Sequence, residues 1–141
     1  MGRSMISWES VSVGMQIPEL VVRPDHAQVF MFSAVTWNRH HIHYSKDAAL
    51  REGLPDIVVQ RGLIGNFLAR LLTDWAGDKV VLRRLAWRMV RSAVVDSEIV
   101  CRGRVVDRTD SPEGRCLRCE VTAADAHGDC LASGDATLIF P

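Results

Sequence analysis

The chain has 141 residues and a mass of 15.7 kDa, and its seventeen basic residues balance seventeen acidic ones. A neutral chain argues against a nucleic-acid partner, and the lack of an apolar run of about eighteen residues argues against a membrane helix. Because 48% of the residues are hydrophobic and no signal-peptide block opens the chain, we expect one domain over residues 1–141, with a real core and a cytoplasmic location.

The chain begins with residues 1–22, which predict a turn or short strand followed by an extended segment. Pro24 keeps the residue before it extended. Asp25 then suits the N-cap of a helix, and Gln28, three residues later, completes a capping box. The apolar residues that follow predict a helix from about His26 to Val35.

Three of the five histidines come next, within the stretch TWNRHHIHYS of residues 36–45. No other window concentrates so many groups that can transfer a proton near neutral pH. We expect this stretch to be a loop. Ser45 then caps a short predicted helix over residues 46–52, which Gly53 ends and Pro55 prevents from resuming.

The most regular helical pattern follows Gln60-Arg61-Gly62. Apolar residues recur from Leu63 to Trp75 at positions i, i+1, i+4, i+5, i+8 and i+9, and Gly77 stops the pattern. A stripe as wide as this predicts a helix that packs against a sheet.

From Lys79 onward the hydrophobic period changes to two, which predicts strands. The four runs are Val80–Val90, Ser97–Val106, Arg115–Ala124 and Cys130–Phe140, separated by Asp96, a loop over residues 108–114 and a hairpin turn at residues 127–129. A helical first half followed by a four-strand antiparallel meander is an α+β plan.

The four cysteines, at positions 101, 116, 119 and 130, raise the question of a metal or redox site. Cys116 and Cys119 form a C-x-x-C pair, but on a strand their odd separation places the thiols on opposite faces. No glycine lies between them, so the chain lacks the turn residue that it would need to fold around a metal. We therefore expect small buried hydrophobic residues in a reducing compartment, with zinc or redox chemistry as the less favoured alternative.

The pattern F-S-A-V-T-W-N-x-H-x-I-H-Y of residues 32–44 resembles the hydratase signature of the MaoC-like hot-dog proteins, roughly S-G-D-x-N-P-I-H. It is more similar to a subgroup with T-[FW]-N-x-H-R-I-H-Y-D, the mitochondrial-type 3-hydroxyacyl-thioester dehydratases and mesaconyl-CoA hydratases. The resemblance covers the chain from about Gly14 to Phe140. It implies a hot-dog fold, in which a curled antiparallel sheet wraps one long central helix.

The resemblance also implies a reaction, the reversible addition of water to an enoyl thioester of coenzyme A or acyl carrier protein, of (R)-type and without a metal or cofactor. His43 occupies the family's histidine position, Asn38 that of the usual aspartate and His40 that of the usual asparagine. Because an amide transfers no proton, Asn38 can only orient water or the 3-hydroxyl, while His43 can handle both protons. His40 is a candidate for a second titrating group.

The enolate oxygen is expected to meet backbone N–H groups where the long helix begins. The family usually has His-Gly there, whereas this chain has Gln60-Arg61-Gly62, so either Arg61 or Gly62 supplies the donor and Arg61 makes the entrance tighter and more positive. Trp37 either packs or lines the acyl pocket. The remaining candidates, expected to be surface or packing residues, are His26, His41 and Tyr44.

Basic residues predominate in the first two long predicted strands. Arg84 and Arg88 are candidates for binding the phosphates of coenzyme A, or the phosphopantetheine and acidic face of a carrier protein. A solvated sheet face explains the same residues equally well. The cluster comprises Lys79, Arg83, Arg84, Arg88, Arg91, Arg102, Arg104 and Arg108, against Asp78, Asp96, Glu98 and Asp107.

Two alternative functions stay open at this point. A hot-dog thioesterase requires a carboxylate near the central helix to activate water, and Asp56 is the candidate. A non-catalytic subunit that binds acyl thioesters within a hetero-oligomer is the other. In either case we expect a homodimer or a heterodimer with another hot-dog subunit, because the sheet leaves an edge strand and an apolar face uncovered.

Overall fold

The structure is a computed structural model and describes residues 6–141. A turn of 3-10 helix, Trp8–Ser10, precedes the first strand, β1 (Gln16–Val22). The remaining elements, in chain order, are α1 (His26–Thr36), a 3-10 turn at His41–His43, α2 (Lys46–Arg51), α3 (Arg61–Ala76), β2 (Val81–Met89), β3 (Ile99–Ser111), β4 (Gly114–Asp125) and β5 (Cys130–Phe140).

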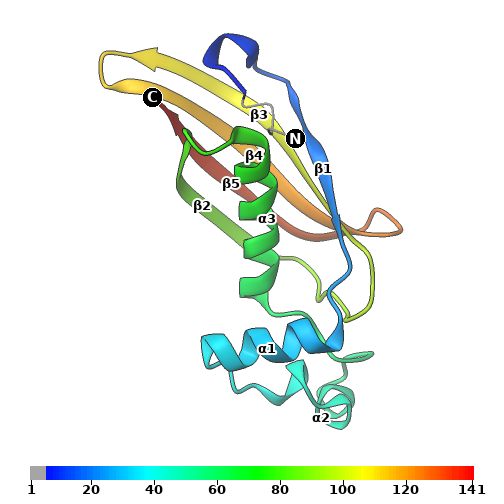
Figure 1. Cartoon of the computed structure of the whole chain (residues 1–141). Coiled ribbons are helices and arrows are strands. Elements are labelled where there is room, and N and C mark those ends of the chain that lie inside the picture. Colours follow the sequence, from blue (N-terminus) through cyan, green and yellow to red (C-terminus); the bar gives the residue numbers. More distant parts are fainter. Residues whose placement is uncertain (1–5) are drawn as a thin grey trace, which may run out of the picture.

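The strands form one antiparallel sheet, in the order β1-β3-β4-β5-β2, which curls around α3 (Figure 1). The predicted α+β plan is therefore confirmed. The four-strand meander is wrong in one respect, because only β3, β4 and β5 are neighbours in chain order and β2 pairs with β5 at an outer edge. Between β2 and β3 the chain runs along the segment that precedes α3, where Val59 N–H donates to Ala93 O (2.8 Å) and Val95 N–H to Ile57 O (3.0 Å).

α3 lies against the inner face of the sheet and buries the predicted apolar stripe. Gly65 is the point of closest approach, because a Cβ added there would lie 2.1 Å from the ring of Trp87 on β2. Gly77 ends the helix with a φ of +83°, as the sequence predicts. Trp75 is partly buried against the core, and the buried residues of the stripe are Leu63, Ile64, Phe67, Leu68, Leu71 and Leu72.

β3 and β4 continue through the region that was predicted to be a loop. Asp110 pairs with Arg115 and Ser111 with Gly114, so that a two-residue turn joins the strands. The loop prediction is wrong because residues 107–110 are all exposed, and a ribbon with two solvated faces shows no alternation of polar and apolar residues. Arg108 anchors this ribbon, since its guanidinium lies over the Trp8 ring at 4.2 Å.

The second 3-10 turn, α1 and α2 form a cap beyond the first turn of α3 (Figure 1). Asp25 caps α1 as predicted, because its Oδ1 accepts a hydrogen bond from Gln28 N–H (2.8 Å). The reciprocal bond of a capping box does not occur among the described hydrogen bonds. Ser45 caps α2 through Ala48 N–H (3.3 Å), and α2 ends one residue earlier than predicted.

The cysteines are free thiols in two environments. Cys101 and Cys119 are buried, and burial raises the pKa of their thiols to about 12 and about 11. Cys116 is partly exposed on the opposite face of β4, as predicted, whereas Cys130 is exposed and its predicted burial is wrong. Within residues 6–141, no group of three or more His, Cys, Asp or Glu residues is placed to hold a metal ion. No helix in the same range is long and apolar enough to cross a membrane.

Candidate active site

The histidine stretch folds back on the end of α1. Trp37 ends the helix in the left-handed region with a φ of 55°, and Asn38 N–H donates to Ser33 O (2.9 Å). Asn38 Oδ1 then accepts from His40 N–H (3.2 Å), which tightens the turn. The loop prediction is wrong for His41–His43, which form one turn of 3-10 helix. These bonds give the stretch a fixed shape.

His43 is the histidine that this turn directs into the protein, with 7% of its surface exposed. Its Nδ1 lies 2.7 Å from Val58 O, and because a carbonyl oxygen only accepts, Nδ1 carries the hydrogen. The lone pair of the neutral ring is therefore on Nε2. Val58 N–H also donates to Ile42 O (3.2 Å), so the segment before α3 holds both the ring and its backbone.

The pKa of His43 lies below its ordinary value of 6.5, chiefly because burial disfavours the charged ring. The hydrogen bond to Val58 acts in the opposite direction, and the charge of His40 adds to the lowering. A neutral imidazole with a fixed tautomer and a free Nε2 lone pair is suited to accept a proton at neutral pH.

His40 lies beside this ring, and Asn38 precedes both histidines in the same stretch. The rings of His40 and His43 are nearly perpendicular, at 88°, with centroids 5.9 Å apart. His40 Nε2 lies 3.0 Å from Glu52 Oε1, and 52% of the His40 side chain is exposed. Asn38 uses its Oδ1 within the turn, whereas its Nδ2 makes no hydrogen bond within residues 6–141 and keeps two donors for a ligand.

The apolar side chains near the turn are largely exposed. Trp37 is 76% exposed and Val35 84%, so the alternative in which Trp37 packs is wrong, and the one in which it lines an acyl pocket stays a prediction. Tyr44 does pack, since it meets Phe30 edge-on at 6.3 Å and its hydroxyl donates to Arg39 O (2.7 Å). A groove of about 470 Å³, lined by Ala27, Gln28, Met31, Phe32, Val35, Leu63 and Asp25, runs from α1 to the first turn of α3.

The two histidines that were predicted to play no part lie on the surface. His41 is exposed beside Tyr44, with the ring centroids 5.4 Å apart. His26 begins α1 and its Nδ1 lies 3.0 Å from Asp96 Oδ2. His41 therefore offers a matched control for His43, since both belong to the same 3-10 turn.

The start of α3 presents free backbone donors. Ile64 N–H makes the first bond within the helix, to Gln60 O (3.1 Å), so the N–H groups of residues 61–63 have no acceptor in the helix. The positive end of the helix dipole adds to their affinity for an anion. A Cβ on Gly62 would lie 3.3 Å from the Phe32 ring, so glycine allows α1 to approach these donors closely.

Arg61 is tied to β2 by a reciprocal pair of hydrogen bonds. Its Nη2 donates to Trp87 O (2.8 Å), and Trp87 Nε1 donates back to Arg61 O (3.1 Å). The guanidinium also lies over the Trp87 ring at 5.0 Å. The positive charge at the start of α3 is therefore fixed in position, and part of its hydrogen-bonding capacity faces solvent.

Sequence reasoning missed two polar residues that belong to this region, Ser33 and Gln60. Gln60 is 1% exposed, and its Nε2 donates to Val29 O (2.6 Å) and to Ser33 Oγ (2.8 Å). The available signal was an amide directly after the apolar run of residues 57–59, at a position where the chain enters a buried helix. An amide there requires buried partners.

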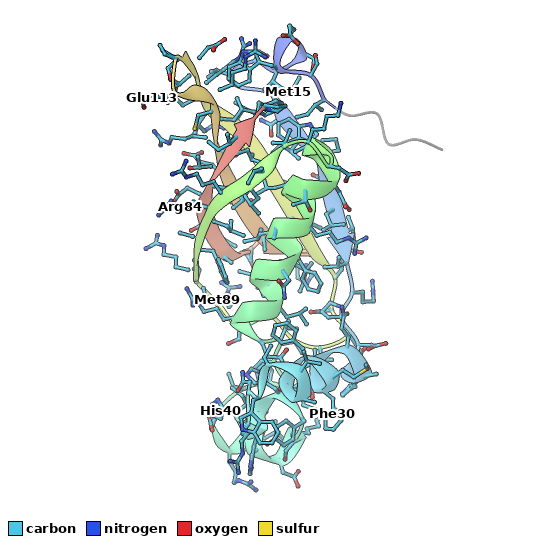
Figure 2. The ribbon with its side chains drawn as sticks, turned by 60° about the vertical axis from the view of Figure 1, so that its left-hand side comes forward. Met15, Phe30, His40, Arg84, Met89 and Glu113 are labelled. Atoms are coloured by element: carbon cyan, nitrogen blue, oxygen red, sulfur yellow. The ribbon has the colours of Figure 1, made fainter. Side chains whose placement is uncertain are left out.

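Four of the eight basic residues in the predicted cluster form ion pairs with carboxylates from other parts of the chain. Arg84 pairs with Asp135. Side chains alternate between the two faces of a strand, and the Trp87 side chain of β2 points to α3, so Arg84 and Arg88 both lie on the opposite face. Figure 2 shows Arg84 on the sheet and His40 in the cap, so the structure does not bring Arg84 to the histidine turn. Arg88 is placed by the face of β2 that it shares with Arg84. Their role in substrate binding stays a prediction. The other ion pairs are Arg91–Asp129, Arg102–Glu19 and Arg104–Glu120.

Asp56, the carboxylate that a thioesterase would need, is already engaged. It accepts hydrogen bonds from Ile57 N–H (2.8 Å) and from Lys46 Nζ (3.1 Å), and these partners lower its pKa. A carboxylate stabilised in its charged form is a weak base. The geometry therefore gives Asp56 a role in fixing α2 to the segment that precedes α3.

This region contains a neutral buried imidazole, the Nδ2 donors of Asn38 in the same histidine stretch, and N–H groups at the start of α3 that have no acceptor in the helix. The first can move a proton, the second can orient a hydroxyl or a water, and the third can stabilise an oxyanion. These are the requirements for adding or removing water next to a carbonyl group.

Comparisons with known proteins agree with this chemistry. A family model described as hydroxyacyl-thioester dehydratase type 2 matches residues 14–95. The 3-oxo-4,17-pregnadiene-20-carboxyl-CoA hydratase beta subunit of Mycobacterium tuberculosis is 27% identical over 77 residues, which are 55% of this chain. The match spans only 60% of that relative's length.

Two solved structures show the fold. A chain of the ChsH1–ChsH2 complex from Mycobacterium tuberculosis superimposes with a TM-score of 0.83 at 21% identity, covering 92% of this chain and 98% of the other. An (R)-hydratase from A. caviae involved in PHA biosynthesis superimposes with a TM-score of 0.85 at 17% identity, covering 94% and 99%. At these identities the likeness concerns the curled sheet around a central helix.

Proposed function

Because this chain belongs to the hydroxyacyl-thioester dehydratase type 2 family, we propose that it catalyses the reversible addition of water to an enoyl thioester, as an (R)-type 3-hydroxyacyl-thioester dehydratase or enoyl-CoA hydratase. The resemblance to the MaoC-like hot-dog proteins is confirmed by this membership and by the fold. The observation that carries the proposal is the buried ring of His43, which Val58 O fixes with Nε2 free to act as a base.

In the direction of hydration, Asn38 Nδ2 orients the attacking water, and His43 Nε2 removes its proton as the water oxygen bonds to C3. The electrons of the double bond move toward the thioester carbonyl, whose oxygen becomes an enolate. The N–H groups of Arg61 and Gly62 stabilise that charge. The His43 imidazolium then delivers its proton to C2 on the same face, and the neutral ring is restored. Dehydration follows the same steps in reverse.

The thioester is carried by coenzyme A or by an acyl carrier protein. Of the predicted basic residues, Arg61 is the one at the start of α3, where Trp87 holds its guanidinium in place. A fixed guanidinium suits a phosphate of the carrier, because little side-chain freedom is lost on binding. Arg84 and Arg88 are proposed as more distant contacts, on the outer face of β2.

A second hot-dog subunit completes the site in this proposal. β1 and β2 are the two edges of the sheet, and the apolar groups on α1 beside the turn are exposed. The relative from M. tuberculosis is named as a beta subunit, and the superimposed chain from the same organism comes from a complex of two proteins. These observations favour a heterodimer over a homodimer, and they keep open a non-catalytic subunit that binds the thioester for a partner.

The direct test is the hydration of crotonyl-CoA and of longer enoyl-CoAs, followed by the loss of the enoyl absorbance. We expect turnover by a dimer of this chain with a co-purified hot-dog subunit, or by a homodimer if no such subunit is required, with the size of the active species measured by sedimentation at micromolar concentration. A fully active monomer would refute the partner proposal. Binding of enoyl-CoA without turnover, alone or with a co-purified hot-dog subunit, would establish the non-catalytic alternative and refute the enzyme.

A further inference from the structure

The polar side chains that residues 6–141 bury completely or nearly so gather in one place. They are Ser33, His43 and Gln60, with exposures of 5%, 7% and 1%. His43 performs the chemistry in the function proposed above, but the other two have no role in it. A core that needed only packing would use apolar residues at these two positions, because buried polar groups are costly unless their hydrogen bonds are made.

Gln60 makes only part of the bonds that its amide can form. Val29 O accepts from one side of the amide, and since a carbonyl oxygen cannot donate, Nε2 must face it. Oε1 is consequently turned away, and it is a buried oxygen without a partner among the described residues. The amide is thus kept for its two donated bonds in spite of an unsatisfied acceptor.

Those two bonds join the elements that carry the site. Gln60 is the N-cap residue of α3, directly before the N–H groups of Arg61 and Gly62. Through Ser33 Oγ it holds α1, and the backbone oxygen of that same Ser33 accepts the Asn38 N–H (2.9 Å). One buried side chain thereby sets the position of Asn38 relative to the helix start. His43 is positioned independently, through Val58.

We propose that Gln60 is a positioning residue, which fixes Asn38 against the backbone N–H groups at the start of α3 through its bonds to Val29 O and Ser33 Oγ. The inference rests on the proposed function, because it assigns Asn38 and these N–H groups to the two ends of one reacting unit. Gln60 itself does not touch the substrate. Its loss displaces two groups that act together in the transition state, and small displacements of such groups are costly.

The test compares Gln60→Met with Gln60→His. Methionine has a similar length and no donor, whereas a histidine ring retains one N–H that can bond Val29 O or Ser33 Oγ. For hydration of crotonyl-CoA we expect Gln60→Met to lower kcat by roughly ten- to a hundredfold with KM little changed. Gln60→His should recover a large part of the loss. The acid limb of the pH profile should stay in place, because the Val58 bond to His43 is untouched.

Ser33→Ala provides a smaller perturbation and a double-mutant cycle. If Gln60 acts through Ser33, the combined Gln60→Met and Ser33→Ala variant should lose less than the product of the two single losses. If the double variant instead loses the full product of the two single losses in kcat, Gln60 does not act through Ser33 and the proposal is overturned. A Gln60→Met variant with the wild-type kcat would overturn it as well. An equal fall in kcat and rise in KM, with Gln60→His no better than Gln60→Met, would reduce Gln60 to a structural residue.

A readout that needs no activity separates this inference from the proposed function. Hydrogen exchange at the Asn38 amide reports its bond to Ser33 O, and we expect it to accelerate in Gln60→Met while the amides of β4 exchange as in the wild type. If the wild type hydrates no enoyl thioester, the proposed function fails and this exchange measurement still decides the coupling. Unchanged exchange at Asn38 overturns it in either case.

Discussion

The molecule has two regions, the sheet with α3, which we call the frame, and the cap that carries the histidine turn. Each region is stabilised in a different way. β4 pairs along its length with β3 on one side and β5 on the other, and its inner face is buried against α3. In the cap, α2 has six residues, and single bonds such as the one from His43 to Val58 position the functional groups. The frame therefore has many redundant contacts, whereas the site depends on a few bonds that one substitution can remove.

The largest expected effect comes from the cap. His43→Ala or His43→Gln removes the base, and losing a positioned general base typically lowers the rate by about a hundred- to ten-thousandfold. The unfolding transition should change little by comparison, since the buried frame is untouched. Steady-state hydration of crotonyl-CoA together with circular dichroism during heating measures both quantities, and added imidazole should restore part of the activity of His43→Ala.

His41→Ala is the matched control, because His41 lies in the same 3-10 turn with its ring exposed. It should retain nearly the wild-type rate. If His40→Ala is inactive and His43→Ala is fully active, the alignment of residues 32–44 with the family signature is wrong and His40 carries the chemistry.

The opposite result is expected in the frame. Leu117 on β4 is fully buried, and Leu117→Ala should lower the free energy of unfolding by about 2 to 5 kcal/mol. The rate per folded molecule should stay near that of the wild type, because no bond of the cap is lost. Urea titration gives the first quantity and activity at low denaturant the second. A large fall in kcat of the fully folded Leu117→Ala variant would contradict the view that the frame and the cap act separately.

Asn38 tests how the cap combines structure with chemistry. Asn38→Ala removes both the Nδ2 donors and the Oδ1 acceptor of His40 N–H, and we expect a loss of roughly tenfold or more in kcat with an unchanged shape of the pH profile. Asn38→Asp keeps the acceptor and restores the commoner family residue, so it should retain activity. If Asn38→Ala equals the wild type, the amide only shapes the turn.

The same contrast explains what could be predicted from the sequence. The α3 stripe and the strands were predictable because burial on one face imposes a period, and Asp25 and Ser45 marked helix starts because capping needs particular side chains. The site residues His43 and Asn38 came from a family pattern. Their geometry could not be predicted, because it depends on Val58 and Ser33, whose backbone oxygens carry no sequence signal.

The errors have the same origin. The exposed ribbon at the end of β3 has no apolar face, so its composition indicated a loop. The position of β2 depends on the Trp87 ring fitting over Gly65, a contact between residues 22 positions apart that no local pattern reveals. The basic cluster appeared unpaired because its carboxylate partners come from other strands, such as Asp135 on β5.

The smallest expected effect is that of His40→Ala, and it depends on pH. The charge of His40 is one cause of the lowered pKa of His43, so its removal should raise that pKa. His43 acts as a base only when neutral, which means that activity is present above its pKa and lost as the pH falls through it. The acid limb of kcat/KM should therefore move to higher pH in His40→Ala. We expect the loss of kcat/KM to be confined to the acid side of the profile, below the ordinary histidine pKa of 6.5, and to disappear at alkaline pH. His41→Ala should leave the limb in place. If His40→Ala instead abolishes one limb of the profile, His40 is a second titrating group in the reaction and not only a neighbouring charge.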